Sequence, residues 1–152
     1  MAKIDIELDE IDSRLIFRLF QTSNVMHRSG TLALNSVGVT TQQWSVLGAL
    51  SRPKVEDGMS INEMCRYLMV SRQNLSEMLK RLEAMGYVKR LPDKVDQRSK
   101  RIVLTDSGLE ALNEINRLMQ GFFGKVMKGL SRDDQISCIH YLTKLRNNMT
   151  ID

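Results

Sequence analysis

The chain contains few of the residues that enzyme and metal sites most often need. Its 152 residues include two histidines, His27 and His140, and two cysteines, Cys65 and Cys138. Neither pair has the spacing of a zinc site, and the chain has no glycine-rich phosphate loop or nucleophile elbow. We therefore expect no enzymatic activity, no metal and no cofactor. Each cysteine has apolar residues near it at helical spacing, so both are predicted to be buried rather than reactive.

Long apolar runs are also missing. No uninterrupted apolar stretch approaches the roughly 20 residues that cross a bilayer, so we expect no membrane-spanning segment. Residues 5–12 include five Asp or Glu, which is wrong for a signal peptide, and the protein is expected in the cytoplasm. Proline and glycine are scattered and no low-complexity linker divides the chain. Residues 1–152 are therefore predicted to form a single domain.

Two short helical patterns follow one another between residues 60 and 86. Ser60 and Glu63 have the spacing of a capping box, which opens the first helix. Ser71 can cap the second helix, and Gly86 can supply the left-handed residue that ends it. Only two residues separate the helices, and so tight a connection makes them cross at a large angle. The pattern predicts a helix-turn-helix whose second helix is presented outward.

The second helix has an apolar and a polar side. The apolar residues recur at the spacing of one buried face and are Leu75, Met78, Leu79 and Leu82. The opposite side and the first turn carry hydrogen-bonding groups that suit base edges and phosphates in a major groove. The residues predicted to contact DNA from this helix are Ser71, Arg72, Gln73, Asn74, Ser76 and Lys80. An ordinary solvated surface helix is the alternative for this segment taken alone.

After Gly86 the pattern changes to that of a β-hairpin. Residues 87–91 and 101–105 alternate or are rich in β-branched side chains, which predicts two strands. The polar segment between them is expected to form a wing, in which Asp96 holds Arg98 extended and leaves its donors for phosphate or a minor groove. The wing residues predicted to contact DNA are Lys94, Asp96, Arg98 and Lys100. A charged loop that is merely solvated is the alternative.

Positive charge is concentrated in this helix and hairpin. Residues 71–101 hold nine Lys or Arg and four Asp or Glu, a balance of +5, whereas the rest of the chain holds thirteen and fourteen, a balance of −1. The net charge of +4 therefore comes from the segment already singled out by its pattern. Such a local basic patch is the electrostatic feature of a phosphate-binding surface, although it does not imply sequence specificity.

Long helices are predicted outside the hairpin region. One runs from about residue 9 to 35, a capping box at Thr40 opens another, and two more follow from residue 106 to 129 and from Ser131 onward. Their apolar surface exceeds what the small winged lobe can cover from one side. Burial against a second copy of the chain is expected, with an intramolecular bundle as the alternative.

These elements define a mainly α (α+β) fold class. The winged helix-turn-helix lobe is predicted at residues 40–105. The helices predicted to form the dimerisation region lie at residues 5–36 and 106–150.

Three motifs resemble the multiple antibiotic resistance regulator (MarR) family of bacterial transcription factors. They are Leu-Glu-Ala-Met-Gly-Tyr-Val-Lys-Arg at 82–90, Asp-Gln-Arg-Ser-Lys-Arg at 96–101 and Leu-Thr-Asp-Ser-Gly at 104–108. The motifs are fairly specific together and weak apart, and the resemblance covers almost the whole chain. It implies a homodimer that binds a pseudo-palindromic operator on double-stranded DNA. Such regulators usually repress nearby genes and release DNA when a small molecule or an oxidant binds.

The resemblance also implies a ligand site where the dimer helices meet the winged lobe. Effectors of the family are often aromatic carboxylates, phenols or related lipophilic compounds, sometimes as thioesters. His27 and Arg28 are candidates to meet an acid or a phenolate, and Trp44 is a candidate to stack on a ring. Each of these residues has an alternative role. Trp44 can belong to the core or to an interface, and His27 or Arg28 can be solvated or paired across the dimer.

The sequence therefore predicts a sequence-specific DNA-binding transcriptional regulator, expected to be a repressor that a small ligand releases from its operator. Non-specific architectural DNA binding and protein binding through the winged helix are alternatives. A redox-sensing regulator ranks lower, because the peroxide-sensing branch of the family has a cysteine near the start of the first long helix. This chain has none there.

Overall fold

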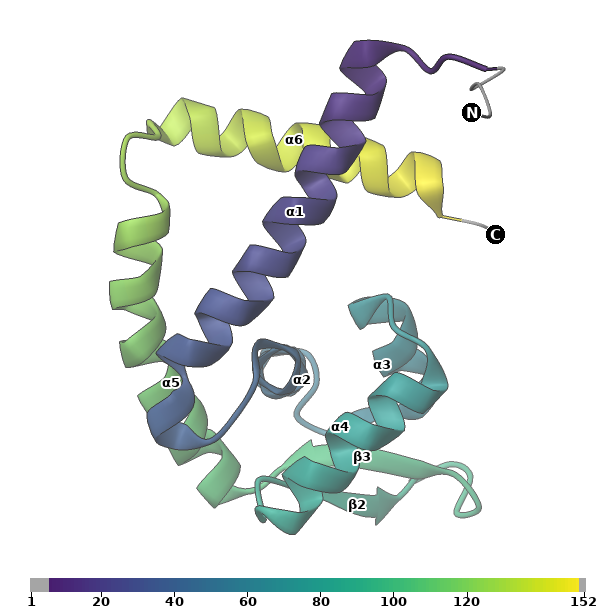
Figure 1. Cartoon of the computed structure of the whole chain (residues 1–152). Coiled ribbons are helices and arrows are strands. Elements are labelled where there is room, and N and C mark those ends of the chain that lie inside the picture. Colours follow the sequence, from purple (N-terminus) through teal and green to yellow (C-terminus); the bar gives the residue numbers. More distant parts are fainter. Residues whose placement is uncertain (1–5, 151–152) are drawn as a thin grey trace, which may run out of the picture. The chain divides into compact units, whose positions relative to one another are not determined.

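The computed structural model describes residues 6–150 of the chain. These residues divide into two compact units, the first ending at Met119 and the second beginning at Gln120. The division falls within helix α5 (Asp106–Val126) (Figure 1). No helix within residues 6–150 combines the length and the apolar character needed to cross a membrane.

The first unit opens with a long helix, α1 (Glu10–Ala33). Asp9 caps it, because the Asp9 carboxylate accepts hydrogen bonds from two backbone N–H groups of the first turn. A short 3-10 helix, η1 (Asn35–Val37), follows α1. The single helix predicted from about residue 9 to 35 therefore ends at Ala33, and η1 begins where the prediction ended. Next comes α2 (Thr41–Leu50), which begins with the predicted capping box at Thr40.

The predicted helix-turn-helix consists of α3 (Ile61–Leu68) and α4 (Arg72–Ala84). Ser60 and Glu63 form the capping box of α3, each accepting a hydrogen bond from the other's backbone N–H, at 3.2 and 2.7 Å. The Ser71 hydroxyl caps α4. Both caps satisfy backbone donors that a helix start otherwise leaves unpaired, and both were predicted from residue type and spacing.

The turn between the two helices depends on one unusual backbone conformation. Met69 adopts a left-handed conformation with φ 56°, and it is the one non-glycine residue with positive φ among the described residues. Its N–H donates to the carbonyl of Cys65, which ends α3. The left-handed residue lets the chain turn sharply within the short link between the helices, so α4 begins soon after α3 ends.

Three short antiparallel strands form the wing and its support, in the order β1-β3-β2. The predicted hairpin is confirmed as β2 (Val88–Pro92) and β3 (Lys100–Leu104). The sequence did not predict β1 (Met59–Ser60), which pairs with β3. Gly58, just before β1, is required: it has φ 82°, and a Cβ there would lie 2.3 Å from the Ile102 carbonyl oxygen.

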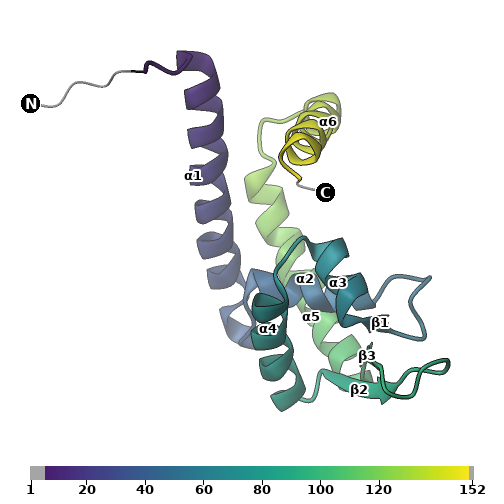
Figure 2. The same cartoon turned by 90° about the vertical axis from the view of Figure 1, so that its right-hand side faces the viewer.

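The core of the first unit is built from α2, α3, α4 and the sheet. Leu47, Met64 and Ile102 are fully buried, and so are three residues of the predicted apolar side of α4: Leu75, Leu79 and Leu82. Figure 2 shows α4 beside the β2–β3 hairpin. Because one side of α4 is completely buried, its polar side is fixed toward solvent.

The two last helices are α5 and α6 (Arg132–Met149). In the first unit, Gly108 near the start of α5 lies so close to Tyr87 that a Cβ there would be 2.0 Å from the Tyr87 carbonyl oxygen. In the second unit, α6 begins with a capping box of Ser131 and Asp134 and has no buried residue. α5 ends at Val126, three residues earlier than predicted.

Candidate nucleic-acid interface

The outward side of α4 carries the polar residues that the sequence predicted for this helix. Ser71 is also at the surface, but its hydroxyl accepts the Asn74 N–H at 3.2 Å and therefore acts as the helix cap. The exposed side chains, called the recognition face below, are Arg72, Gln73, Asn74, Ser76 and Lys80. They combine two carboxamides, one hydroxyl and two cations, which is the set of groups that can read base edges and bind phosphates.

Arg72, the first residue of α4, is held by α3. Its Nη2 donates a hydrogen bond to the side-chain oxygen of Asn62. Both residues are exposed, so this contact orients the guanidinium at the surface rather than burying it. Asn62 was not among the predicted site residues, because nothing in the local pattern indicates that residues ten positions apart meet across the turn.

The wing turn is held by carboxylates that accept backbone N–H groups. Asp93 accepts from Val95 at 2.9 Å and from Asp96 at 3.2 Å. These N–H groups, together with the Arg101 guanidinium, hold the pKa of Asp93 below its ordinary value. Asp96 accepts the backbone N–H of Arg98 at 3.0 Å, so it positions the Arg98 backbone and does not hold its side chain. The side chains of Arg98 and Lys100 are exposed.

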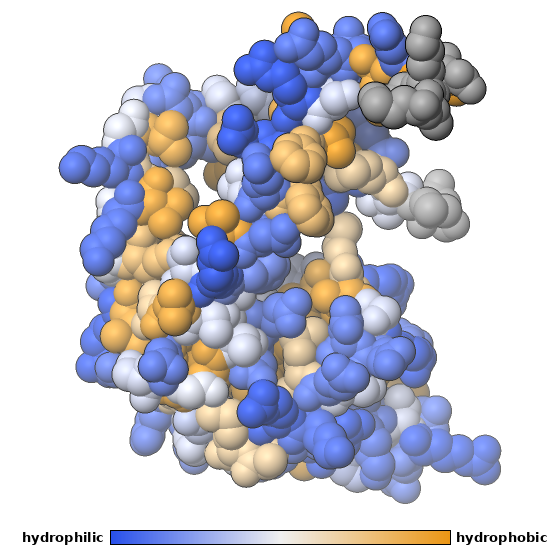
Figure 3. All heavy atoms as spheres, viewed as in Figure 1, coloured by the Kyte–Doolittle hydropathy of each residue, from blue (hydrophilic) through white to orange (hydrophobic). Residues whose placement is uncertain are grey.

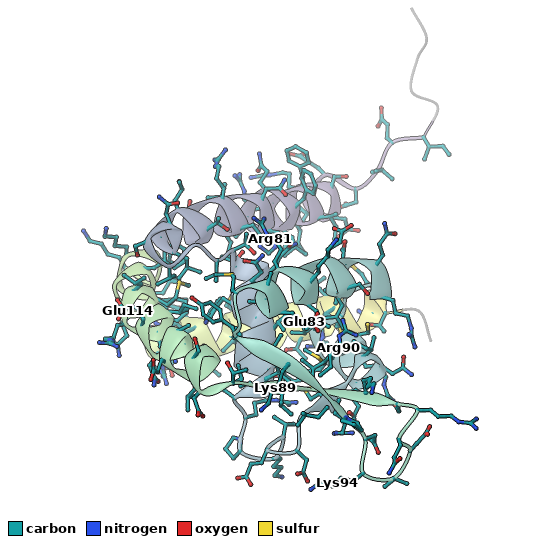
Figure 4. All side chains as sticks on the ribbon, turned by 90° about the horizontal axis from the view of Figure 1, so that it is seen from below. Arg81, Glu83, Lys89, Arg90, Lys94 and Glu114 are labelled. Atoms are coloured by element: carbon teal, nitrogen blue, oxygen red, sulfur yellow. The ribbon has the colours of Figure 1, made fainter. Side chains whose placement is uncertain are left out.

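Lys94 lies in the wing as predicted (Figure 4), but its charge is partly compensated by a neighbouring carboxylate. Its Nζ lies 2.7 Å from Oδ1 of Asp57, in the loop between α2 and β1. The hydrogen bond and the positive charge of Lys94 lower the pKa of the Asp57 carboxyl. Both side chains are largely exposed, so the pair is weak and solvent competes with it.

Arg101 fixes the wing to the helix-turn-helix. Its guanidinium lies 3.2 Å from Asp93 and 3.4 Å from Glu63, and it donates to the carbonyl of Gly58 at 2.6 Å. It thereby joins the wing, α3 and the loop before β1. Arg101 was predicted only as part of a strand and of the motif at 96–101. Its partners more than 35 positions away were not recognisable from the sequence.

Another ion pair links α4 directly to strand β2 of the wing. Arg90 on β2 donates from Nε to Oε1 of Glu83 near the end of α4, at 2.5 Å (Figure 4). The side chains are partly exposed. This contact and that of Arg101 hold the recognition face and the wing in one fixed arrangement.

The residues predicted for ligand binding lie on α1 and α2. The ring of His27 contacts the hydroxyl of Thr41, with 2.8 Å between Nδ1 and Oγ1, and this joins late α1 to the start of α2. His27 and Trp44 are half-buried and Arg28 is exposed. Among the described residues, no group of three or more His, Cys, Asp or Glu is arranged to hold a metal ion.

The prediction that both cysteines are buried is wrong. Cys65 is only partly buried and Cys138 is exposed, and neither forms a disulfide. Cys138 neighbours Ile136 and Ile139, but these apolar residues of α6 are themselves exposed, at 57% and 65%. Apolar spacing on the helix therefore did not imply burial within the chain.

Comparisons with known proteins agree with this geometry. A sequence model described as the MarR family matches residues 37–99, the segment that contains α3, α4 and most of the wing. The transcriptional activatory protein BadR of Rhodopseudomonas palustris is 44% identical over 141 residues, which cover 92% of this chain and 81% of BadR. The chain belongs to the MarR family.

MarR-family proteins are DNA-binding transcriptional regulators and not enzymes, and this chain is a transcriptional regulator of that type. Two solved structures share the MarR-type fold with it. The repressor CouR, bound to a 23-mer DNA duplex, has a TM-score of 0.79 at 24% identity, covering 94% of this chain and 99% of CouR. The organohalide-sensing regulator RdhR, bound to 2,4-dichlorophenol, has a TM-score of 0.81 at 19% identity, covering 97% and 86%.

Proposed function

We propose that this MarR-family regulator binds DNA sequence-specifically, with the recognition face of α4 in the major groove and the wing against the flanking backbone or minor groove. The observation that carries the proposal is the exposed set of carboxamides and cations on α4, which the Glu83–Arg90 ion pair links to a cationic wing. Cations such as Arg98 supply affinity that does not depend on sequence, whereas Gln73 and Asn74 can each bond two positions of an adenine.

A second copy of the chain completes the proposed DNA-binding unit. The apolar side chains of α1 support this: Phe17 and Phe20 are 61% and 62% exposed, and with Leu8 and Ile16 they line a hollow of about 510 Å³. Figure 3 shows apolar side chains at the surface of α1. Contiguous exposed apolar surface of this kind is typical of protein interfaces, and a homodimer is the usual form.

In this proposal residues 40–105 are the DNA-binding lobe, and the helices at 5–36 and 106–150 form the dimer. A two-fold dimer sets its recognition helices about 34–36 Å apart, one turn of DNA. The operator is therefore proposed to be a pseudo-palindrome. Sedimentation of the full chain tests the dimer: Phe17→Glu together with Phe20→Glu is expected to give monomers, and dimers that persist would contradict this interface.

A competition experiment tests sequence specificity. A labelled duplex from the promoter region next to the gene is bound at physiological salt and challenged with random DNA. A specific regulator is expected to prefer its operator by about 10³-fold or more. Equal competition by both duplexes would contradict the proposal and indicate an architectural DNA-binding protein.

We further propose that a small aromatic acid or phenol controls DNA binding. The 2,4-dichlorophenol bound to RdhR supports the class of ligand, and the His27–Thr41 contact supports the place. His27 and Arg28 would meet the acidic group and Trp44 the ring. Benzoate and 2,4-dichlorophenol serve as probes of the protein–DNA complex. We expect a probe to release the wild-type protein from DNA and to have no such effect on His27→Ala or Trp44→Ala. If both variants respond to the probe as the wild type does, this site is wrong.

Whether the regulator represses or activates its target genes is decided by measuring their transcription. The family resemblance predicts repression relieved by ligand, whereas the 44% identical relative is named as an activatory protein. A reporter fused to the bound promoter separates the two: deletion of the regulator raises transcription under repression and lowers it under activation.

A further inference from the structure

A cationic hollow lies on the winged lobe, apart from the recognition face. It has a volume of about 470 Å³ and opens between the loop that follows α2, helix α3 and strand β3. The lining residues that matter here are Arg52, Lys54, Glu63, Arg66, Tyr67 and Arg101. Four of these six side chains are cationic and one is acidic.

The charges in the hollow are unequally compensated. Arg101 is paired with Glu63 and Asp93. Within the described residues, Arg52 and Arg66 form no ion pair, although the charge of Arg66 contributes to lowering the pKa of Glu63. Lys54, an exposed residue that also lines the hollow, likewise forms no ion pair with residues 6–150. Three cations around one hollow thus remain available to a ligand.

Arg52 is already oriented for binding. Its guanidinium carbon lies 3.7 Å from the centre of the Tyr67 ring, and its Nε donates to the carbonyl of Ala49 at 3.1 Å. The side chain is half-buried. A guanidinium stacked on an aromatic ring loses little further freedom when it binds, and its remaining N–H donors match the oxygens of phosphate or carboxylate.

We propose that this hollow binds a small molecule with two or more negative charges, such as a phosphate ester, a diphosphate or a polycarboxylate. A single exposed ion pair contributes little, so binding here needs several charges that meet Arg52, Lys54 and Arg66 together. Duplex DNA fits this hollow less well than a small anion does. A wide, stiff duplex contacts side chains that project from the surface, whereas Arg52 is half-buried. The proposal does not depend on where the operator is bound.

Calorimetric titration of the full chain with pyrophosphate and, separately, with citrate tests the site. The first variant is Arg66→Gln, at an exposed side chain that forms no hydrogen bond with residues 6–150. The second is Arg52→Gln, and each variant is checked for unchanged thermal unfolding. Arg98→Gln is the matched control, because it removes the same charge from the wing. We expect the Kd to rise about tenfold in both hollow variants and to stay within about twofold in the control.

The outcomes separate the possible sources of binding. Tighter binding of pyrophosphate than citrate assigns the site to phosphate compounds, and the reverse assigns it to carboxylates. Three results would overturn the proposal: no binding to the wild type at millimolar anion, equal affinity in the wild type and Arg66→Gln, or a loss confined to Arg98→Gln. If Arg66→Gln instead flattens only the salt dependence of DNA binding, the residue contacts DNA phosphate and the small-anion site is wrong.

Discussion

The side-chain oxygen of Asn62 accepts a hydrogen bond from the Arg72 guanidinium, which ties the first residue of the recognition face to the preceding helix. Arg72 is therefore positioned before DNA arrives. An unheld arginine has to be ordered during binding, at a cost in side-chain entropy.

Asn62→Ala is expected to weaken binding to a specific duplex by about fivefold, the equivalent of roughly 1 kcal/mol for one hydrogen bond. The slope of log affinity against log salt should stay the same, because no charge is removed. Fluorescence anisotropy over a salt series measures both quantities. Asn116→Ala, on an exposed position of α5, is the control, and an equal loss of affinity in the two variants would contradict the positioning role.

Arg101→Met and Arg98→Met should separate stability from DNA binding. The Arg101 side chain is 24% exposed and holds three structural elements together, so its loss is expected to lower the free energy of unfolding by about 2 kcal/mol. Arg98 is exposed, and its loss should change stability by less than about 0.5 kcal/mol while weakening DNA binding. Urea unfolding and anisotropy on the same samples check this. Equal stability of the two variants would show that Arg101 is not the clamp.

Asp57→Asn should strengthen DNA binding. The carboxylate now pairs with Lys94, at 2.7 Å, and its removal leaves the ammonium free for phosphate. We expect the salt slope to become steeper by about one counterion. Glu56→Gln removes the same charge from the neighbouring position and is the control for a general electrostatic effect. Should both variants change the slope alike, the specific pair with Lys94 has no role.

Glu63 should make the protein sensitive to acid. The backbone N–H of Ser60 above all, then the Ser60 hydroxyl and the charge of Arg101, hold the pKa of Glu63 below its ordinary value of 4.5. Because the folded pKa is the lower one, the stabilisation is present above 4.5 and is lost as the pH falls through the folded value. As the pH falls from 4.5 to the lower folded pKa, the wild type should therefore lose stability more steeply than Glu63→Gln.

Urea unfolding at a series of pH values measures this difference. Glu110→Gln, which removes a carboxylate from an exposed position on α5, should retain the steep acid dependence of the wild type. The same slope in the wild type and in Glu63→Gln would rule out a contribution from the capping box.

Local features were predictable from the sequence. The caps at Thr40, Ser60 and Ser71 depend on residues within three positions, and the buried side of α4 depends on a single helical period. The wing was recognisable because its strands are neighbours in sequence. Family membership, and with it the mainly α winged-helix fold, could be inferred from motifs within 82–108.

Long-range contacts were not predictable in the same way. Nothing near Arg101 indicates that its partner is a carbonyl at Gly58, and two residues are too few for β1 to leave a pattern. Asp57, which compensates Lys94, lies 37 positions from it. Cys138 was wrongly predicted to be buried. Apolar periodicity shows which side of a helix is apolar, but it does not show whether another part of the chain packs against that side.

Selection from a library of randomised DNA duplexes by the full-length protein tests the central claim most directly. The account predicts enrichment of an inverted repeat whose half-sites are centred about 10 base pairs apart, with base preferences that change in Gln73→Ala and persist in Arg98→Ala. A selected pool without any shared or symmetric sequence, or one that Gln73→Ala leaves unchanged, would contradict a recognition face on α4.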